Sequence, residues 1–373
     1  MKRLMAVLLL VSLTLGVTSS LLAVSESAVL FLLISPGARA AGMGEAFVAV
    51  ADDATAAYWN PAGLAFQRGR EITLMHANWL PQLVSDMSYE FLAYKQYVES
   101  LGGTIGGNIT FLNLGEQVQT GEQGPEPLGT FSSWDLGVTL CYATQLNDNF
   151  GLGVGMRYIH SNLAPIGAGA EKGTGVGSTF AVDLGILYKM PFLPGLNFGA
   201  NLSNMGPKIT YIDAAQADPI PTNLKIGFSY DLMNSDYNQF RISMDTNKLL
   251  VVRYYEDENG NRVDDIAGMS DEEKEKLTPK SDPFYKAIFT AWGDGSLSDQ
   301  MGRLISSIGA EYIYNKMISI RVGYYYDEEG KVKYPSFGAG LQYSAFRFDF
   351  AYVAAEQGHP LSDTMRFSLT ANF

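Results

Sequence analysis

The sequence predicts an all-β membrane protein, a 14-stranded antiparallel transmembrane β-barrel with a small helical N-terminal plug. Three observations indicate this fold class. Segments in which apolar and polar residues alternate recur along the 373 residues, and a period of two is that of a strand whose two faces meet different surroundings. The connections between these segments alternate between short and long. After residue 27, no stretch approaches the roughly 20 apolar residues that a membrane helix needs, so we expect insertion by strands.

Composition excludes several classes of protein. Charged residues are only 17% and aromatic residues 12% of the chain, which is too apolar for a disordered protein. A formal net charge of −13 gives no attraction for phosphate, so we expect no nucleic-acid partner. The single cysteine, Cys141, excludes an internal disulfide and a cysteine-based zinc site. The three histidines are far apart and no catalytic motif occurs, so we expect no metal, no cofactor and no enzyme activity.

Residues 1–27 have the layout of a secretory signal peptide. Two basic residues precede the apolar run Leu4–Val17, and small residues follow it. An uncleaved N-terminal membrane anchor is the alternative interpretation. The cleavage site stays open between positions after Ser19, Ala23 and Ser27.

Residues 28–70 are predicted to form the plug. They contain no clean strand, yet they are apolar and rich in small residues. Ser35 is placed to cap a helix with Pro36 at its first position, and Asp52 or Asp53 to cap a second helix that ends before the next proline. Compact helices before the first strand suit a segment that fills a barrel lumen.

Glycine recurs at lumen-facing positions of the predicted strands. These glycines either let a plug backbone approach the wall or merely relieve crowding in a small barrel, and the sequence leaves both interpretations open. They are Gly151, Gly153, Gly155, Gly338 and Gly340.

The barrel wall is predicted over residues 71–373. Its clearest strand is the last, in which five apolar residues alternate with four polar ones over 365–373. Regular or weaker alternation gives fourteen strands, an even number as in bacterial outer-membrane barrels. In chain order they lie at about 71–80, 88–98, 103–113, 135–142, 150–158, 180–188, 196–202, 224–230, 240–244, 308–312, 318–324, 337–343, 346–352 and 365–373.

Connection lengths favour a membrane barrel over a soluble β-sandwich, in which strands would also alternate. Turns from even to odd strands are short and most connections from odd to even strands are long, as in outer-membrane barrels. The short turns lie at 99–102, 147–149, 191–195, 234–237, 315–316 and 344–345. The long connections lie at 114–131, 165–177, 204–221, 252–303, 327–334 and 354–363, and we expect 252–303 to be a long extracellular loop.

Outward aromatic residues gather near both predicted rims, where amphipathic rings meet lipid headgroups. Tyr142, Tyr188, Tyr230, Tyr343, Phe150 and Phe346 fall near the short turns. Tyr158, Tyr324, Tyr352, Phe180 and Phe337 fall near the long connections. We therefore expect outer-membrane lipid around the wall.

Charged residues at inward positions most simply solvate the lumen or hold the plug. A role in selectivity or ligand binding is the alternative. The arginines are Arg157, Arg241, Arg321, Arg347 and Arg366, and the carboxylates are Asp135, Asp183, Asp245 and Asp349.

Three segments of the long connections come close to known motifs without completing them. Gly167–Gly177 is glycine-rich, but its lysine precedes the glycine, so a flexible loop is favoured over phosphate binding. Asp257–Asp265 has calcium-type ligands, but its glycine is misplaced, so a solvated acidic loop is favoured over a calcium site. Ser270–Leu277 is predicted to form a short capped helix.

Two motifs before the first strand carry a family resemblance. Residues 31–66, FLLISPGARAAGMGEAFVAVADDATAAYWNPAGLAF, combine Ser-Pro-x-Ala-Arg-Ala-x-Gly-Met-Gly with Trp-Asn-Pro-Ala. The chain resembles the PorV/PorQ family, relatives of the FadL-type long-chain fatty-acid transporter, over nearly its whole mature length. The motifs include Ser35, Pro36, Arg39, Gly42, Gly44, Trp59, Asn60 and Pro61, which we assign to the plug.

The resemblance implies a fourteen-stranded barrel with a plug in the cell outer membrane. It also implies a role in type IX secretion, in which such barrels bind the C-terminal signal domain of secreted cargo leaving the translocon and pass it to the attachment machinery. The resemblance is closest in the last third of the chain. The alternative is a FadL-like transporter of hydrophobic small molecules, which needs a gap in the wall; Gly102–Gly103 and Gly106–Gly107 are placed to kink the third strand.

If the chain is a cargo receptor, its longest connection is the expected contact surface. Aromatic anchors next to acidic turns are typical of protein interfaces, in which a few such residues dominate the binding energy. The predicted partner-binding residues are Phe284, Tyr285, Phe289 and Trp292.

Overall fold

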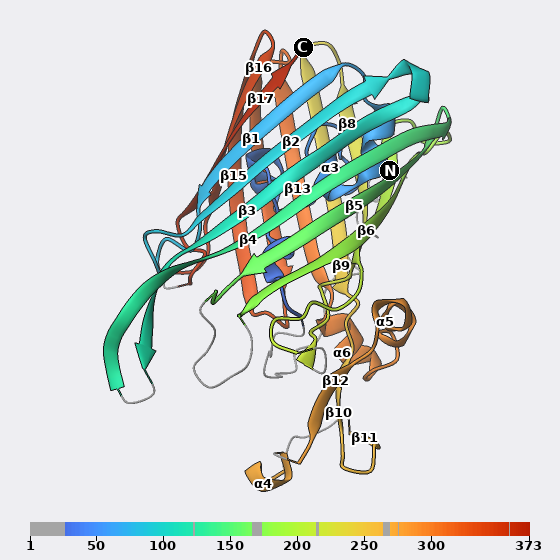
Figure 1. Cartoon of the computed structure of the whole chain (residues 1–373). Coiled ribbons are helices and arrows are strands. Elements are labelled where there is room, and N and C mark those ends of the chain that lie inside the picture. The colour runs from blue at the N-terminus through green and yellow to red at the C-terminus, as the bar shows by residue number, and fades with distance from the viewer. Residues whose placement is uncertain are drawn as a thin grey trace.

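Fourteen strands close into one antiparallel barrel in the computed structural model (Figure 1). The structure describes residues 27–121, 124–165, 174–213, 216–263, 269–274, 276–357 and 359–373. The barrel order is β1-β17-β16-β15-β14-β13-β9-β8-β7-β6-β5-β4-β3-β2, so each wall strand pairs with the wall strands before and after it in the chain, and β1 closes on β17. The predicted fold class is confirmed.

The strands have the following bounds. The first seven are β1 (Arg70–Asn78), β2 (Ser88–Val98), β3 (Gly103–Gly121), β4 (Gly124–Asn147), β5 (Phe150–Asn162), β6 (Val176–Lys189) and β7 (Leu196–Met205). The others are β8 (Asn223–Asn234), β9 (Asn238–Leu249), β13 (Ile305–Tyr314), β14 (Ile318–Asp327), β15 (Val332–Tyr343), β16 (Phe346–Val353) and β17 (Thr364–Asn372).

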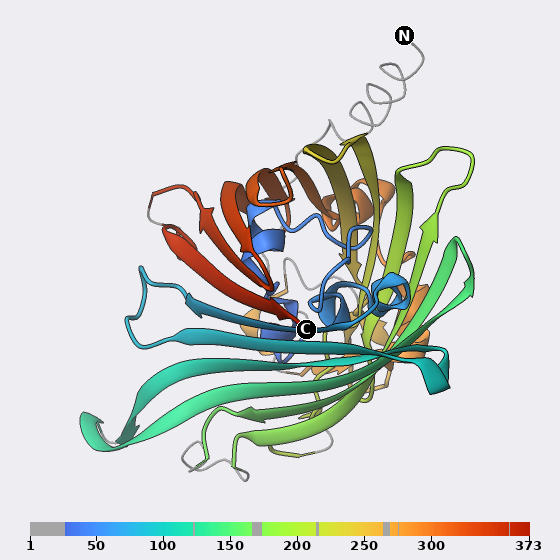
Figure 2. The same ribbon diagram turned by 90° about the horizontal axis from the view of Figure 1, so that it is seen from above.

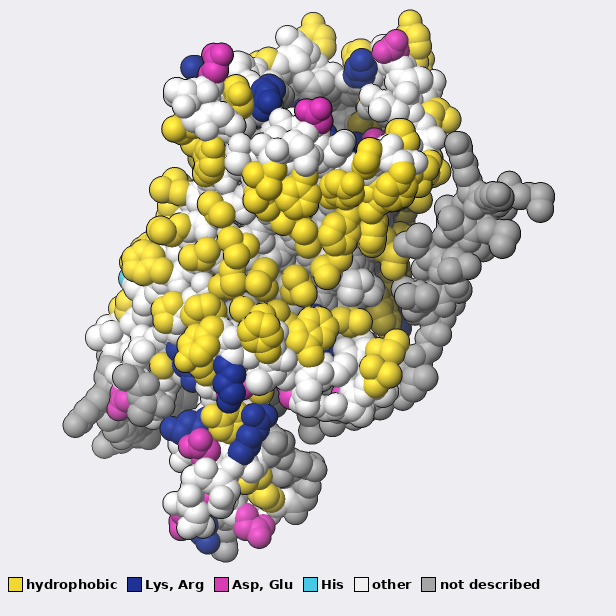
Figure 3. All heavy atoms as spheres, turned by 90° about the vertical axis from the view of Figure 1, so that its right-hand side faces the viewer, with side chains coloured by type: hydrophobic (Ala, Val, Ile, Leu, Met, Phe, Trp, Pro, Cys, Tyr) yellow, Lys and Arg dark blue, Asp and Glu magenta, His cyan; other side chains and the backbone are white. Residues whose placement is uncertain are grey.

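Alternation along each strand sorts side chains between the lumen and the outer face. On β17, for example, Phe367 is 40% exposed on the outside whereas Ser368 is 3% exposed on the inside. Hydrophobic side chains accordingly form a belt over the barrel, and charged side chains gather beyond its two ends (Figure 3). No helix among the described residues is long and apolar enough to cross a membrane.

The short turns lie where the sequence predicts them, but the predictions of two long connections are wrong. Residues 114–131 are mostly strand, because β3 and β4 continue as a hairpin well beyond the barrel (Figure 1). The register of the β3–β4 pair shifts between Asn113 and Glu116, around Gly115, which has a φ of 79°. Both faces of this extension meet water, so it lacks the apolar–polar alternation by which the wall strands were recognised. β14 and β15 likewise extend to residues 327 and 332, which shortens the connection predicted at 327–334.

The connection between β9 and β13 contains a small structured unit of its own. Three short strands, β10 (Arg253–Glu256), β11 (Arg262–Val263) and β12 (Thr278–Ser281), form a separate sheet. The same connection also contains three helices: α4 (Asp271–Lys274), α5 (Phe284–Thr290) and α6 (Leu297–Gly302). The short helix expected in 270–277 is α4, and Ser270 caps it because its hydroxyl accepts from the Glu273 amide.

The segment before β1 lies inside the barrel (Figure 2). It consists of short helices joined by turns: η2 (Leu30–Leu33), α2 (Ala38–Gly42), α3 (Ala56–Trp59) and η3 (Pro61–Phe66). A further turn of 3₁₀ helix, η4 (Glu99–Leu101), joins β2 to β3.

The predicted start of the first plug helix is wrong. Ser35 does not cap α2, which begins at Ala38 after Gly37 with a φ of 91°. The Ala38 amide donates instead to Ser368 Oγ of β17 at 2.9 Å, so a side chain of the wall caps the helix.

The second plug helix begins three residues after Asp53 and ends, as expected, before Pro61. Asp53 accepts from the Thr55 amide and hydroxyl in the turn before it, whereas Asp52 caps nothing and pairs with arginines. Pro61 opens η3, whose cap is Asn60.

Several sequence predictions lie wholly or partly outside the described residues. Of the predicted signal peptide, 1–27, residues 1–26 lie outside them, as do residues 167–173 of the glycine-rich loop. Residues 264–268 also lie outside them, so the acidic segment is described only from Asp257 to Val263. There Asp257 Oδ1 accepts from the amides of Asn259 and Asn261 and thereby closes the β10–β11 turn.

Candidate functional site

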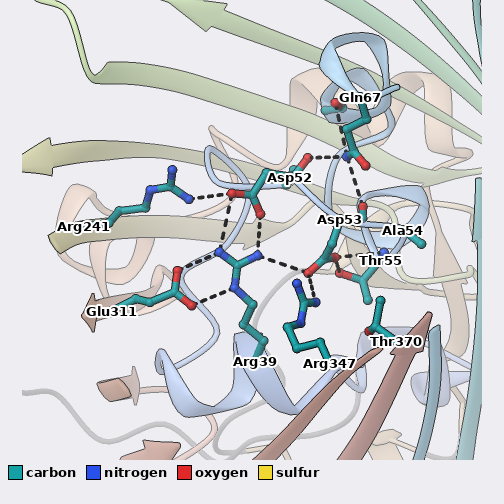
Figure 4. Close-up of polar contacts among 12 residues, drawn as sticks. Arg39, Asp52, Asp53, Ala54, Thr55, Gln67, Arg241, Glu311, Arg347 and Thr370 are labelled. Atoms are coloured by element: carbon teal, nitrogen blue, oxygen red, sulfur yellow. Dashed lines mark hydrogen bonds and ion pairs between the residues drawn. The ribbon is translucent and has the colours of Figure 1, made fainter. Parts of the chain in front are cut away.

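Arg39 on α2 is the centre of a buried ion network between plug and wall (Figure 4). Its guanidinium reaches three carboxylates: Glu311 of β13 through Nε and Nη2 at 2.8 and 2.7 Å, Asp52 at 2.5 Å and Asp53 at 3.2 Å. Burial alone would lower the pKa of Arg39, but Asp52 and Glu311 raise it well above its usual value. The guanidinium therefore stays charged inside the lumen.

The network closes into a ring of alternating charges. Arg321 joins Glu311 to Asp349 at 2.7 and 2.8 Å. Arg347 joins Asp349 back to Asp53 at 2.8 and 2.9 Å, and Asp53 returns to Arg39. Buried charges are tolerated when each has several partners of opposite sign. Two of the six residues in this ring belong to the plug and four belong to the wall. The plug therefore cannot leave the lumen without breaking the ring.

Further ion pairs extend from the ring toward the end of the barrel that carries the short turns. Asp52 also pairs with Arg241 of β9 at 2.7 Å, and Arg241 pairs with Asp231 of β8 at 2.6 Å. These groups border a polar cavity of about 700 Å³ that is also lined by Glu71 and Lys95. The plug forms the inner side of this cavity through residues 49–52.

Wall side chains also hold the plug backbone. Asp245 Oδ2 accepts from the amides of Phe47 and Val48 at 2.7 and 2.8 Å. Arg366 donates to the carbonyl of Ser35 and to Glu45 Oε1. Because these groups are buried, each would be left without a partner if the plug moved away.

Glycines lie where the plug backbone comes closest to the wall. A Cβ added to Gly42 would lie 2.9 Å from Cα of Gly338, and one added to Gly153 would lie 2.3 Å from the amide of Ala62. Gly155 and Gly340 instead face wall side chains. Some of the inward glycines therefore allow the plug backbone to approach, and others make room for the charged residues.

Two motif residues bridge plug segments to each other and to the wall. Asn60 Nδ2 donates to the carbonyls of Val48 and of Ile186 on β6, both at 2.9 Å. Trp59 Nε1 donates to the carbonyl of Pro36 at 3.1 Å, while the Lys225 ammonium lies 4.3 Å from the centre of a Trp59 ring.

The wall is continuous at the glycines considered for an opening. β3 pairs with β2 from Gly103 to Asn113 without a shift of register, and with β4 from Thr104 to Asn113. Pairing therefore shows no gap on either side of β3 at the glycines that the transporter alternative would use.

The predicted partner-binding residues lie on and beside α5, outside the barrel (Figure 1). Tyr285, Phe289 and Trp292 are 65%, 78% and 49% exposed, whereas Phe284 is half-buried. The opposite face of α5 packs through Ala287 in a small apolar cluster with Leu250, Val252 and Ala291. The helix is thus held in place by this packing and exposes aromatic side chains to solvent on its other face.

The structure brings together most residues that the sequence singled out. The eight plug residues lie in the segment that fills the lumen. Of the lumen residues, Arg241, Arg321, Arg347 and Asp349 belong to the ion network, Arg366 holds the plug, and Arg157 pairs with Asp183 in the wall at 2.8 Å. Sequence reasoning missed Glu311, although it occupies an inward position two residues after Gly309 on β13, and alternation could have identified it.

A comparison with protein families gives one match. A family model described as type IX secretion system protein PorV matches residues 20–255. This range includes only the first few residues of the last third of the chain, where the resemblance was expected to be closest. A comparison with curated proteins finds no significant match.

Solved structures similar to the chain include hydrocarbon transporters and channels. The Pseudomonas putida toluene transporter TodX is 13% identical, with a TM-score of 0.51 over 90% of this chain and 96% of that one. A TodX deltaS2S3 mutant, described as a monoaromatic hydrocarbon channel, is 13% identical, with a TM-score of 0.53 over 91% and 99%. A Pseudomonas aeruginosa FadL homologue is 13% identical, with a TM-score of 0.48 over 89% and 98%. At these identities the TodX structures show a common fold.

Proposed function

The chain belongs to the PorV family of type IX secretion system proteins in the outer membrane, and on that basis we propose that it binds secreted cargo at its outer face. The bound element is the C-terminal signal domain of the cargo, received from the translocon. The barrel then passes the cargo to the surface attachment machinery. Family and fold are those of secretion and transport barrels, and the proposal assigns the chain no chemical step.

The exposed aromatic surface of α5 is the observation that carries the proposal. Tyr285 and Phe289 project from a helix whose other face is packed, and Trp292 follows its end by two residues. Little ordering is therefore needed before a partner binds. Trp292 Nε1 donates to the carbonyl of Ile288 at 3.0 Å, which fixes the indole against the helix. Aromatic anchors of this kind usually dominate a protein interface.

The filled lumen supports binding outside the barrel. The ring around Arg39 and the contacts of Asp245 and Arg366 tie the plug to five wall strands, β9, β13, β14, β16 and β17. Passage of a cargo chain through the lumen would require the plug to move and these contacts to break. A receptor on the outer connections needs no such movement.

A FadL-like transporter of hydrophobic small molecules is the alternative. It would need both a plug that yields and a gap in the wall, and the pairing of β3 is uninterrupted at the glycines where a gap was considered. The experiment below therefore includes an uptake measurement.

The test replaces Tyr285, Phe289 and Trp292 together with serine. We expect the barrel to fold normally, because these side chains are not part of the wall, and cargo to accumulate in the periplasm. Affinity for a purified signal domain should fall by at least 30-fold, since each buried anchor contributes on the order of 2 kcal/mol. The matched control replaces Val118 and Leu128, exposed apolar residues of the β3–β4 hairpin, and should secrete normally.

Secretion at wild-type levels in the triple variant would overturn the assignment of α5. A defect confined to the hairpin control would move the contact surface to β3–β4. Normal secretion in both variants, combined with loss of uptake of a hydrophobic compound when Gly106 and Gly107 are made bulky, would favour the transporter.

A further inference from the structure

The polar cavity of about 700 Å³ at the short-turn end of the barrel has no part in the functions considered so far. Figure 2 shows the barrel from this end, which faces the periplasm in the predicted topology. The plug contributes residues 49–52 and 66–68 to the cavity, and wall strands and short turns form the other sides. Its volume is within the range of small-molecule sites.

The carboxylates of the cavity already have partners. Asp52 pairs with Arg39 and Arg241, and Asp231 also pairs with Arg241. Glu71 lies opposite Lys95 in the strand register, but its Oε1 accepts from the amide of Ala54 at 2.5 Å. The charged residues that line the cavity are Asp52, Arg68, Glu71, Lys95, Lys189, Asp231 and Arg241.

The other three basic residues have no carboxylate partner among the residues that the structure describes. Lys95 is 5% exposed, and its Nζ donates to the carbonyl of Arg68 at 2.9 Å. Lys189 Nζ lies 4.1 Å from the centre of the Phe66 ring, and within the described chain its ammonium makes no hydrogen bond. Arg68 donates to the carbonyl of Ala65 and to the side chain of Gln145.

These three cations come together around residues 66–68 of the plug. The Phe66 ring contacts Lys189, and the Arg68 carbonyl binds Lys95. Buried or half-buried charges in proteins are normally paired, and like charges that lie close together repel each other. The chain as a whole carries a formal net charge of −13, so its composition does not account for basic groups gathered without acidic partners. An anion bound between them would offset this repulsion.

The rest of the cavity indicates what kind of molecule carries the anion. A cavity of this size holds more than a single inorganic ion. Asparagine side chains line it, and each presents both a donor and an acceptor to a polar ligand. They belong to the short turns and strand ends around the cavity: Asn149, Asn197, Asn234 and Asn372.

We propose that this cavity binds a hydrophilic organic anion, whose carboxylate or phosphate oxygens accept hydrogen bonds from Lys95 and Lys189. The asparagines bind the polar groups of the same molecule. The site is separate from the aromatic surface of α5, and it does not depend on the secretion role. An acidic peptide and a phosphorylated small molecule share this chemistry, and the test below distinguishes them.

The test is lysine footprinting of the full-length protein in detergent. The rate at which acetic anhydride acetylates Lys189, which is exposed, is measured by mass spectrometry with and without a probe. Two pairs of probes are used: the blocked peptide acetyl-Ala-Asp-Ala-Asp-amide with its asparagine analogue, and glycerol phosphate with glycerol. We expect one anionic probe to slow acetylation about tenfold at about ten times its Kd, and the neutral analogues to have no effect. The anionic probe that protects identifies a carboxylate or a phosphate as the bound group.

Lys316 is the internal control. It lies on a short turn at the same end of the barrel, and its side chain is 65% exposed. Its acetylation should not change with any probe. Equal protection of Lys316 and Lys189 would mean that the anions act on all lysines and would overturn the proposal.

Variants identify the basic residues as the cause of binding. Lys95→Gln keeps a donor for the Arg68 carbonyl but removes the charge, and should weaken binding of the protective probe about tenfold, since a hydrogen bond to a charged group is lost. Lys189→Gln should abolish the rise in thermal stability that the same probe gives the wild-type protein, whereas Lys189→Arg should retain it. Lys316→Gln should bind like the wild-type protein.

Three further results would overturn the proposal. One is that neither anionic probe protects Lys189 in a folded, heat-modifiable barrel, which would mean that water alone fills the cavity. Another is equal protection by an anionic probe and its neutral analogue. The third is wild-type affinity in both Lys95→Gln and Lys189→Gln.

Discussion

Replacing Arg39 with alanine should loosen the plug as a unit. The substitution removes four hydrogen bonds shorter than 3.3 Å that reach three carboxylates. Breaking a buried ion pair costs about 3–5 kcal/mol. Glu311 and Asp53 keep Arg321 and Arg347 as partners, so we expect the lower end of that range. A cost of about 3 kcal/mol corresponds to an open fraction on the order of 100-fold larger.

The native cysteine provides the assay. Cys141 is the single cysteine of the chain, is 6% exposed, and its thiol lies 3.5 Å from the carbonyl of Ala57 on α3. A thiol reagent reaches it only when the plug moves, so the labelling rate follows the open fraction. We expect Arg39→Ala to label on the order of 100-fold faster than the wild-type protein. Arg241→Ala is the control; it breaks less buried pairs and should change the rate less than tenfold.

Labelling at the wild-type rate in Arg39→Ala, with a barrel that still shows heat-modifiable migration, would refute the reasoning. It would mean that the ring does not limit plug opening and that α3 is held independently of α2.

Other substitutions test the plug, the barrel closure and the topology. Gly44→Val should destabilise the protein by at least about 1–3 kcal/mol in thermal unfolding, because Gly44 has a φ of 62° and no room for a Cβ; unchanged stability would contradict this contact. Deletion of Phe373, whose backbone pairs with the start of β1, should prevent barrel closure and leave degraded protein, as judged by the amount of heat-modifiable barrel; normal levels would disprove it. With Cys141 replaced by serine, an impermeant thiol reagent should label Asp257→Cys on intact cells and Asp148→Cys only after lysis; the reverse result would invert the orientation.

The order and facing of the wall strands were predictable because the causes are local. A strand that separates lipid from a polar lumen must alternate, so 365–373 can be recognised without its neighbours. The same reasoning failed at 114–131, where both faces of the strands meet water. The period of two also assigned Arg321 and Asp349 to the inward face. It could not identify their partners, because alternation gives the face of a strand and not the residue opposite.

The partners of the plug were decided by tertiary structure. Arg39 and Glu311 are 272 positions apart and meet because closure of the barrel brings β13 beside α2. The helix start at Ala38 likewise depends on Ser368, which a local capping rule cannot include. The sequence alone thus determined the barrel, its strand faces and the presence of a plug, because these follow from alternation and composition. The ion ring arises only when distant strands become neighbours around the closed wall.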